Sequence, residues 1–262
     1  MQHKPNPQPP IVQSAIIGAL LFVLAACQTT GAAKPKDEPM DGVQQTLFQS
    51  AREAEMTNKY DLAASAYARL MEHRSQDPEI LASLLRNLRY SGYANQGLDY
   101  LRTNVDASLL TDPEVRFEKG KALLAAGQHL DALDELAALR NEAPNDWRVH
   151  SALGITFDSL ERFNEALDSY QAALRLSPNN EVVMNNMAMS YAMVGRLRDG
   201  IDLLERAAVV NRSNTQIRQN LALLYAINGN MDRAKALAAM DLDKGELETN
   251  LTFYRRFEGS PR

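Results

Sequence analysis

Residues 147–180 read WRVHSALGITFDSLERFNEALDSYQAALRLSPNN, and this stretch decides the fold. Two small residues, Gly154 and Ala166, stand among bulky residues such as Phe157 and Tyr170 at helical spacing. Two antiparallel helices approach closely only where their side chains are small, and bulky neighbours then fill the space around the crossing. The stretch therefore predicts a helix-turn-helix pair.

The same pattern recurs along the chain, with one residue inserted before the third unit. Small residues mark the second helix of each unit, at Ala63, Gly97, Ala132, Ala166, Gly200 and Ala234. The matching sites on the first helices are Ala51, Leu85, Gly120, Gly154, Ala188 and Ala222, of which only Leu85 is large. The turns fall on Asn58, Gly92, Gly127, Glu161, Gly195 and Gly229. The pattern resembles the tetratricopeptide repeat (TPR), whose period is about 34 residues. This resemblance implies an all-α fold, a right-handed superhelical solenoid.

We expect six units, at residues 44–77, 78–112, 113–146, 147–180, 181–214 and 215–248, so that 44–248 form the solenoid. Asp77 and Asp112 each precede a proline and a glutamate, as N-capping residues do. The chain has no alternating apolar–polar run of strand length. Residues 244–258 read as one more helix, and we assign 249–262 to a capping helix and tail, because a solenoid must cover its last apolar face. Arg116 and Lys119 occupy usually apolar sites, which questions the packing of the third unit.

The N-terminus carries the chain's long apolar run, Ile11–Ala26, after a segment with Lys4. This run is shorter than the ~20 apolar residues that a membrane-spanning helix needs, and its small-residue end is typical of a signal peptide. Leu24–Cys27 (LAAC) resembles the bacterial lipobox, which implies cleavage after residue 26 and lipidation of Cys27. The alternative is an ordinary signal peptide with an incidental cysteine.

Residues 27–43 follow as a flexible, Pro- and charge-rich tether. In lipoproteins an aspartate after the lipidated cysteine favours retention in the inner membrane. Gln28 stands there instead. We therefore expect an outer-membrane lipoprotein, anchored by acyl chains and facing the periplasm.

Composition and motifs argue against several classes of function. The chain has 28 Lys+Arg against 33 Asp+Glu, a net charge of −5, whereas nucleic-acid binding needs a basic surface. His73, His129 and His150 form no metal-ligand pair, and we expect His150 to face the core. Neither nucleotide-binding nor serine-hydrolase motifs occur. The sequence predicts a protein that is not an enzyme, with no metal, no cofactor, no nucleic acid and no small-molecule substrate.

A protein-binding groove is the remaining prediction. First helices line the concave face of TPR arrays, and the candidate groove residues are Asn185, Asn186, Met189 and Met193 in the fifth unit and Gln216, Gln219, Asn220 and Leu223 in the sixth. Asn186 and Asn220 are one repeat apart, so we expect them to stack as a short ladder. Their amides could pair with the backbone of an extended peptide, beside an adaptable methionine wall. The alternative is that these asparagines bond only to neighbouring helices and the methionines are core.

The last third of the chain also resembles the TadD family, the TPR lipoproteins of tight-adherence (Tad/Flp) pilus systems. The resemblance lies in Asn185–Ala188 (NNMA), Val194–Leu197 (VGRL), Asn220–Leu223 (NLAL), Ala239–Leu242 (AMDL) and Asn250–Arg256 (NLTFYRR). It implies a pilotin-like factor that supports an outer-membrane secretin and pilus assembly, with the secretin or another assembly component as protein partner.

Two other functions stay open. The chain could be a general envelope scaffold for outer-membrane protein assembly or for recruiting peptidoglycan enzymes. It could also be an accessory modulator of an enzyme.

Overall fold

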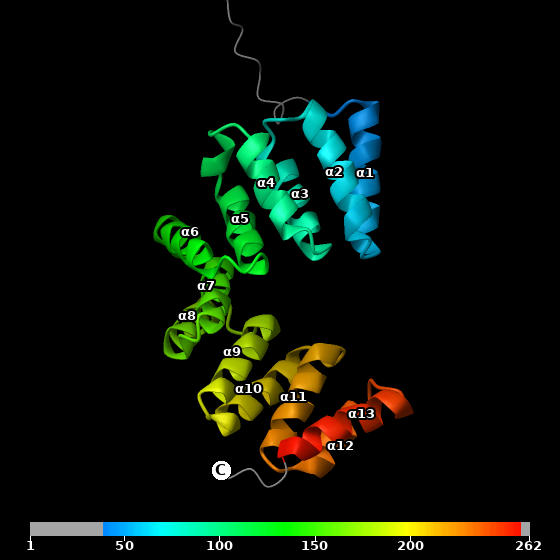
Figure 1. The fold of residues 1–262 in the computed structure, drawn as a ribbon, viewed down its shortest axis with the longest axis vertical. Helices are drawn as coiled ribbons and strands as arrows, with labels where there is room; N and C mark the ends of the chain where they lie inside the picture. Colours follow the sequence, from blue (N-terminus) through cyan, green and yellow to red (C-terminus); the bar gives the residue numbers. More distant parts are fainter. Residues whose placement is uncertain (1–38, 258–262) are drawn as a thin grey trace, which may run out of the picture. The chain divides into compact units, whose positions relative to one another are not determined.

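The protein is described by a computed structural model over residues 39–257, and these residues form thirteen α-helices and no strand. The helices follow one another in antiparallel pairs (Figure 1). In order, they are α1 Gly42–Met56, α2 Tyr60–His73, α3 Pro78–Tyr90, α4 Ala94–Thr103, α5 Pro113–Ala125, α6 His129–Glu142, α7 Trp147–Ser159, α8 Phe163–Leu176, α9 Glu181–Met193, α10 Leu197–Val210, α11 Thr215–Ile227, α12 Met231–Ala238 and α13 Lys244–Tyr254. The all-α, TPR-like helix-turn-helix architecture predicted from the sequence is confirmed.

The turns between the helices of each pair share one backbone conformation. The residues with positive φ in the described part of the chain are Asn58, Gly92, Gly127, Glu161, Gly195 and Gly229, the six expected turn positions. Glycine adopts this left-handed conformation at no steric cost, whereas most L-residues avoid it. Glycine therefore ends the first helix in four of the six units, and Asn58 and Glu161 adopt the same conformation in the other two.

Small residues let the two helices of a unit approach closely, but their partners vary between units. A Cβ added to Gly200 would lie 2.8 Å from the carbonyl oxygen of Ala188, so this pair meets as expected. At Gly154 an added Cβ would lie 2.6 Å from Cδ1 of Tyr170, so the nearest neighbour is this ring rather than Ala166.

The one large residue of the first-helix series is accommodated by the glycine opposite it. The position of an added Cβ on Gly97 is 3.4 Å from Cδ2 of Leu85, which is ordinary contact. Leu85 is fully buried. The crossing in the second unit therefore pairs a large residue on the first helix with a glycine on the second helix.

N-capping side chains start the first helices as the sequence predicts. Asp77 Oδ1 accepts hydrogen bonds from the backbone N–H groups of Glu79 and Ile80, at 3.1 and 3.3 Å. Asp112 Oδ1 accepts the same pair from Glu114 and Val115, at 3.0 and 3.2 Å. Each cap satisfies backbone donors that have no partner within the helix.

The buried apolar residues form three clusters rather than one continuous core. The first joins α1 to the start of α5, and the third joins α8 to α13. The middle cluster is small, and its buried members are Phe117, Leu136, Leu139, Val149, Ala152 and Leu153. The third unit thus supplies little apolar contact, as its charged residues suggested.

Ion pairs replace apolar packing in that unit. Arg116 and Lys119 on α5 both bind Glu135 on α6, at 2.7 and 2.5 Å, and Arg116 also binds Glu142 at 2.6 Å. Burial by itself would raise the pKa of Glu135, but Arg116 and Lys119 outweigh it and hold that pKa below its ordinary value. The two cations at usually apolar sites are therefore accommodated by carboxylates on the partner helix.

The C-terminal helix α13 begins at Lys244, where the sequence predicts a further helix to start, and thus before the domain boundary drawn at residue 249. Asp243 and Glu246 form a capping box at the start of α13. Leu251 and Tyr254 are buried and belong to the third core cluster. Helix α13 therefore covers the apolar end of that cluster. At the other end, α1 begins at Gly42, two residues before the boundary of the first unit.

Candidate protein-binding groove

A cavity of 540 Å³ opens along the first helices of four successive units, α3, α5, α7 and α9. We call it the first-helix groove. Its apolar lining includes Tyr90, Phe117, Trp147, Ile155 and Val182. Its polar lining includes Arg89, Lys121, Arg148 and Asn186. These helices come from the second to the fifth unit. The groove therefore shares only the fifth unit with the expected site, which lay in the fifth and sixth units.

Several apolar side chains of the groove face solvent. Tyr90 is 51% exposed, Val182 is 53% exposed and Ile155 is 39% exposed, although each projects from a helix with a buried face. Scattered single apolar residues on a surface are ordinary, but these three line one cavity. The groove therefore offers an apolar surface that a ligand could cover.

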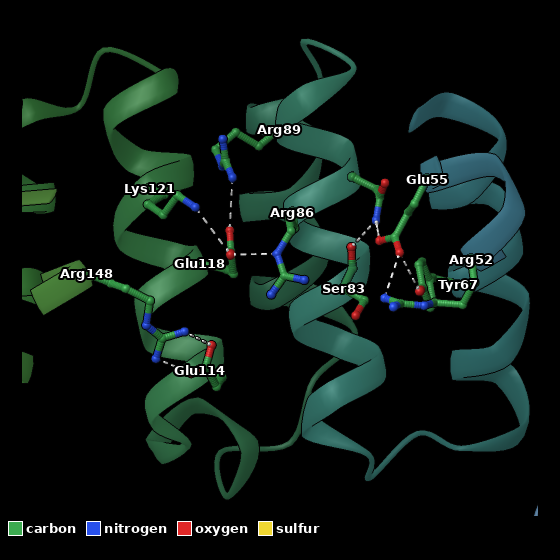
Figure 2. Close-up of polar contacts among 11 residues, drawn as sticks. Arg52, Glu55, Tyr67, Ser83, Arg86, Arg89, Glu114, Glu118, Lys121 and Arg148 are labelled. Atoms are coloured by element: carbon green, nitrogen blue, oxygen red, sulfur yellow. Dashed lines mark hydrogen bonds and ion pairs between the residues drawn. The ribbon is translucent and has the colours of Figure 1, made fainter. Parts of the chain in front are cut away.

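A buried carboxylate organises the basic side of the groove (Figure 2). The Glu118 side chain on α5 is 2% exposed and accepts from Arg86 Nε at 2.9 Å and from Arg89 Nη2 at 3.3 Å. Lys121 Nζ lies 3.4 Å from the same carboxylate. Burial by itself would raise the pKa of Glu118, but Lys121, Arg89 and Arg86 outweigh it and hold that pKa below its ordinary value. Glu118 thus stays ionised and gathers three cations from α3 and α5.

Aromatic rings contact two of these cations, Arg89 and Lys121, and also Arg148. The Arg89 guanidinium lies 4.2 Å from the centre of the Tyr90 ring, within the range of a cation–π contact. Lys121 Nζ and the Arg148 guanidinium lie 5.0 and 5.1 Å from the centre of the Phe117 ring.

Arg148 on α7 has two carboxylate partners of its own. Its Nη1 donates to Glu114 at 3.1 Å and its Nε donates to Asp146 at 3.0 Å. The hydrogen bonds that Arg148 donates to Asp146 and Glu114 raise the pKa of its guanidinium. Arg148 is therefore already saturated by carboxylates, unlike the cations around Glu118.

The asparagines predicted for the groove pair differently from the expected ladder. Asn220 Nδ2 donates to Asn185 Oδ1 at 2.8 Å, and Asn185 Nδ2 lies 3.4 Å from Asn186 Oδ1. Asn185 is buried, and Asn186 lines the first-helix groove. The bonded pair is thus Asn185 and Asn220, which ties α9 to α11, and Asn186 is the residue left facing the groove.

The other predicted residues divide between a second cavity and packing. Met189 and Met193 line a cavity of 500 Å³ together with Ser190 and Phe163. Gln219 donates to Asp241 at 3.1 Å, beside the Arg218–Asp241 ion pair. Gln216 is exposed, and Leu223 packs against the third core cluster. No cavity or groove that we describe brings the eight residues together.

The main lining residues were not among the sequence candidates. Tyr90, Phe117 and Lys121 lie in units whose repeat pattern is weak, whereas Ile155 lies in the well-defined fourth unit. No periodic polar residue drew attention to any of the four. Their available signal was the presence of aromatic and basic residues on consecutive first helices.

A repeated hydrogen-bond network accounts for two partly buried acids that could be mistaken for catalytic groups. Tyr170 donates to Asp158 at 2.8 Å, and Ser190 on the next first helix donates to the same carboxylate at 2.7 Å. Three units earlier, Glu55 accepts from Tyr67 at 3.3 Å and from Asn87 at 2.7 Å. Burial raises the pKa of Asp158 despite the hydrogen bonds from Ser190 and Tyr170. These acids join successive units.

The remaining sequence predictions concern a metal site, His150 and the N-terminal segment. Within residues 39–257, no three His, Cys, Asp or Glu side chains are arranged to hold a metal ion. His150 is partly exposed rather than in the core, and its Nε2 lies 2.8 Å from the Pro144 carbonyl oxygen. No helix in the described part of the chain combines the length and the hydropathy that crossing a membrane requires. Cys27, the expected signal peptide and most of the tether lie outside the described residues.

Comparison with known proteins supports the fold. Residues 117–181 match the sequence model of the tetratricopeptide repeat family. No curated protein matches the chain in sequence. The solved MamA RS-1 ArsTM double mutant has a TM-score of 0.50 at 18% identity, over 67% of this chain and 98% of that one. MamA AMB-1 has a TM-score of 0.50 at 21% identity, over 66% and 100%.

A thermophilic TPR protein of Thermus thermophilus has a TM-score of 0.49 at 20% identity, over 80% of this chain and 98% of that one. At these identities a structural likeness concerns the fold alone. The TPR repeats predicted from the sequence are confirmed, whereas the TadD resemblance stays a prediction.

Proposed function

We propose that this chain is a non-catalytic scaffold that binds an extended segment of a partner protein in the first-helix groove. TPR proteins bind protein partners, and the observation that carries the proposal for this chain is the apolar lining of the groove. Tyr90, Ile155 and Val182 are exposed on three first helices and line one cavity. Covering exposed apolar surface contributes roughly 25 cal/mol per Å².

The same groove suits an extended segment rather than a folded surface. Its lining comes from four successive units, so a chain laid across them would meet new side chains at each unit. Asn186 adds an amide with both donor and acceptor groups for the backbone of such a segment.

We further propose that the scaffold acts at the outer membrane as a lipid-anchored, pilotin-like factor for a secretin of a Tad/Flp pilus. The lipobox-like Leu24–Cys27 supports the anchor, and Gln28 after the cysteine supports the outer membrane. The TadD-like segments between Asn185 and Arg256 support the pilus role. The partner segment would then belong to the secretin or to another assembly component.

Copurification from detergent-solubilised envelopes tests the proposal. The full chain would be compared with Ile155→Asp, which places a charge in the groove. The matched control is Val209→Asp on α10, an equally aliphatic and more exposed residue. We expect a secretin or pilus component to copurify with the wild type and the control and to be lost from Ile155→Asp.

Equal recovery with both variants would contradict binding in the groove. Recovery of outer-membrane assembly proteins or peptidoglycan enzymes, in place of pilus components, would contradict the pilus role and leave the groove standing.

A further inference from the structure

We propose that the partner segment carries an Asp or Glu side chain that binds Arg89 and Lys121, next to an apolar side chain that packs on Tyr90 and Ile155. This inference rests on the proposed function, since it names the chemistry of the segment that the groove binds.

The groove carries basic side chains. The ionisable side chains that line the groove, within the described residues, include Arg89, Lys121 and Arg148, and all three are basic. Behind them, Glu118 is shared by Arg86, Arg89 and Lys121, so this cluster keeps an excess of two positive charges. Complementary charge is what orients and selects a partner at such a surface.

Lys121 shares its one carboxylate partner with two arginines. Burial lowers the pKa of its ammonium group and Arg89 lowers it further, whereas Glu118 raises it. The net direction is downward, so one shared carboxylate does not fully compensate this charge. A second carboxylate within contact distance would stabilise the charged form.

Arg89 has unused hydrogen-bonding capacity. Its Nε is buried and has no hydrogen-bond partner among residues 39–257, while its Nη2 donates to Glu118 at 3.3 Å. Its side chain is 12% exposed and lies over the Tyr90 ring. Because Glu118 and Tyr90 already restrict this side chain, binding a carboxylate costs little additional side-chain entropy.

Arg148 serves as an internal comparison. It lies in the same groove, but Glu114 and Asp146 already bind it. Two carboxylates for one guanidinium leave no need for a third. The acidic residue of the partner therefore binds at the α3–α5 side of the groove.

The apolar half of the recognised segment follows from the same geometry. Tyr90 is next to Arg89 on α3, and its exposed ring borders the cavity together with Ile155. A carboxylate at Arg89 and Lys121 thus brings the neighbouring residues of an extended segment to these two side chains. An aromatic or branched aliphatic residue fits this position.

A random peptide library displayed on phage, selected on the immobilised full chain in detergent, tests the inference. We expect the enriched peptides to combine Asp or Glu with a neighbouring aromatic or aliphatic residue. The most enriched peptide is then synthesised with a fluorophore, alongside a copy in which each Asp or Glu is replaced by its amide. We expect the amide copy to bind about tenfold or more weakly, as the loss of a charge-assisted hydrogen bond implies.

The protein side is tested with Lys121→Gln and a matched control, Lys235→Gln, an exposed lysine on α12. We expect about tenfold or more weaker binding of the acidic peptide to Lys121→Gln, and wild-type binding to Lys235→Gln. Thermal melts verify that each variant folds. The amide copy of the peptide leaves the protein unchanged, so it decides the matter if Lys121→Gln fails to fold.

The outcomes separate the two proposals. If the enriched peptides lose binding to Ile155→Asp but bind equally as amides, the acidic partner is refuted and the groove is retained. If the peptides bind Ile155→Asp and Lys121→Gln with the same affinity as they bind the wild type, they bind elsewhere, and both proposals are refuted.

Discussion

Replacing Glu118 with Gln removes the charge that Arg86, Arg89 and Lys121 share while keeping the size of the side chain. Leaving buried cations without their partner costs about 3–5 kcal/mol. The Arg86 and Lys121 side chains are 34% and 25% exposed, so both can turn partly towards water. We therefore expect the low end of that range, about 3 kcal/mol. For a chain of this size that corresponds to a Tm lower by about 6–12 °C.

The destabilisation caused by Glu118→Gln should depend on pH. The pKa of Glu118 is held below its ordinary value of 4.5, so its contribution is fully present above that value. The contribution is lost as pH falls through the lowered pKa, because protonated Glu118 no longer neutralises the cations. The difference in Tm between wild type and Glu118→Gln should thus be largest at neutral pH and shrink as pH falls below about 4.5.

Circular dichroism melts at neutral and acid pH, about 7 and about 3, measure the lowering of Tm and its change with pH. The matched control is Glu165→Gln, an exposed carboxylate that pairs with Arg162 three residues away, and we expect no measurable change there. An unchanged Tm for Glu118→Gln at neutral pH would refute the reasoning. A difference of the same size at both pH values would show that charge is not its cause.

Three further changes test the fold and the anchor. Gly154→Ala would place a Cβ 2.6 Å from Cδ1 of Tyr170 and should destabilise the protein by about 1–3 kcal/mol, whereas Gly42→Ala meets open space and should not; equal melts would contradict the packing. Glu161→Gly relieves a φ of 58° and should stabilise by about 0.5–1 kcal/mol in a denaturant titration, and a loss of stability would contradict this account of the turn. Cys27→Ser should abolish labelling by a fatty-acid analogue and release the protein from membranes, and label retained on the variant would contradict lipidation.

The parts of the fold that the sequence predicted well are those decided by local chemistry. Gly92 and the glycines equivalent to it mark the turns because a positive φ favours glycine. This preference depends on the conformation of one residue alone. Asp77 and Asp112 mark helix starts because a cap bonds to backbone groups two and three positions away. Such signals need no knowledge of the tertiary structure.

The groove could not be located in this way, because its residues meet only through tertiary packing. Glu118 sits among Arg116, Lys119 and Lys121, which in sequence is typical of a solvated helix. Its burial arises because α3 brings Arg86 and Arg89 against it.

The asparagine pairing shows how small a shift suffices. A strict 34-residue step pairs Asn186 with Asn220, whereas the hydrogen bond joins Asn220 to Asn185. A helix turns about 100° per residue, so neighbouring asparagines point to different surfaces. The period of the repeat therefore predicts which helices contribute to a site. It does not predict which of two adjacent side chains on a helix faces that site.

Site-specific photo-crosslinking tests the central claim, binding in the first-helix groove, most directly. A photoreactive phenylalanine analogue would replace Tyr90 or Ile155 in the groove, or Leu130 or Val209 on second helices, in the full chain in its native envelope. We expect one and the same partner to crosslink from both groove positions and from neither second-helix position. Crosslinks to that partner from Leu130 or Val209, with none from Tyr90 and Ile155, would contradict the account.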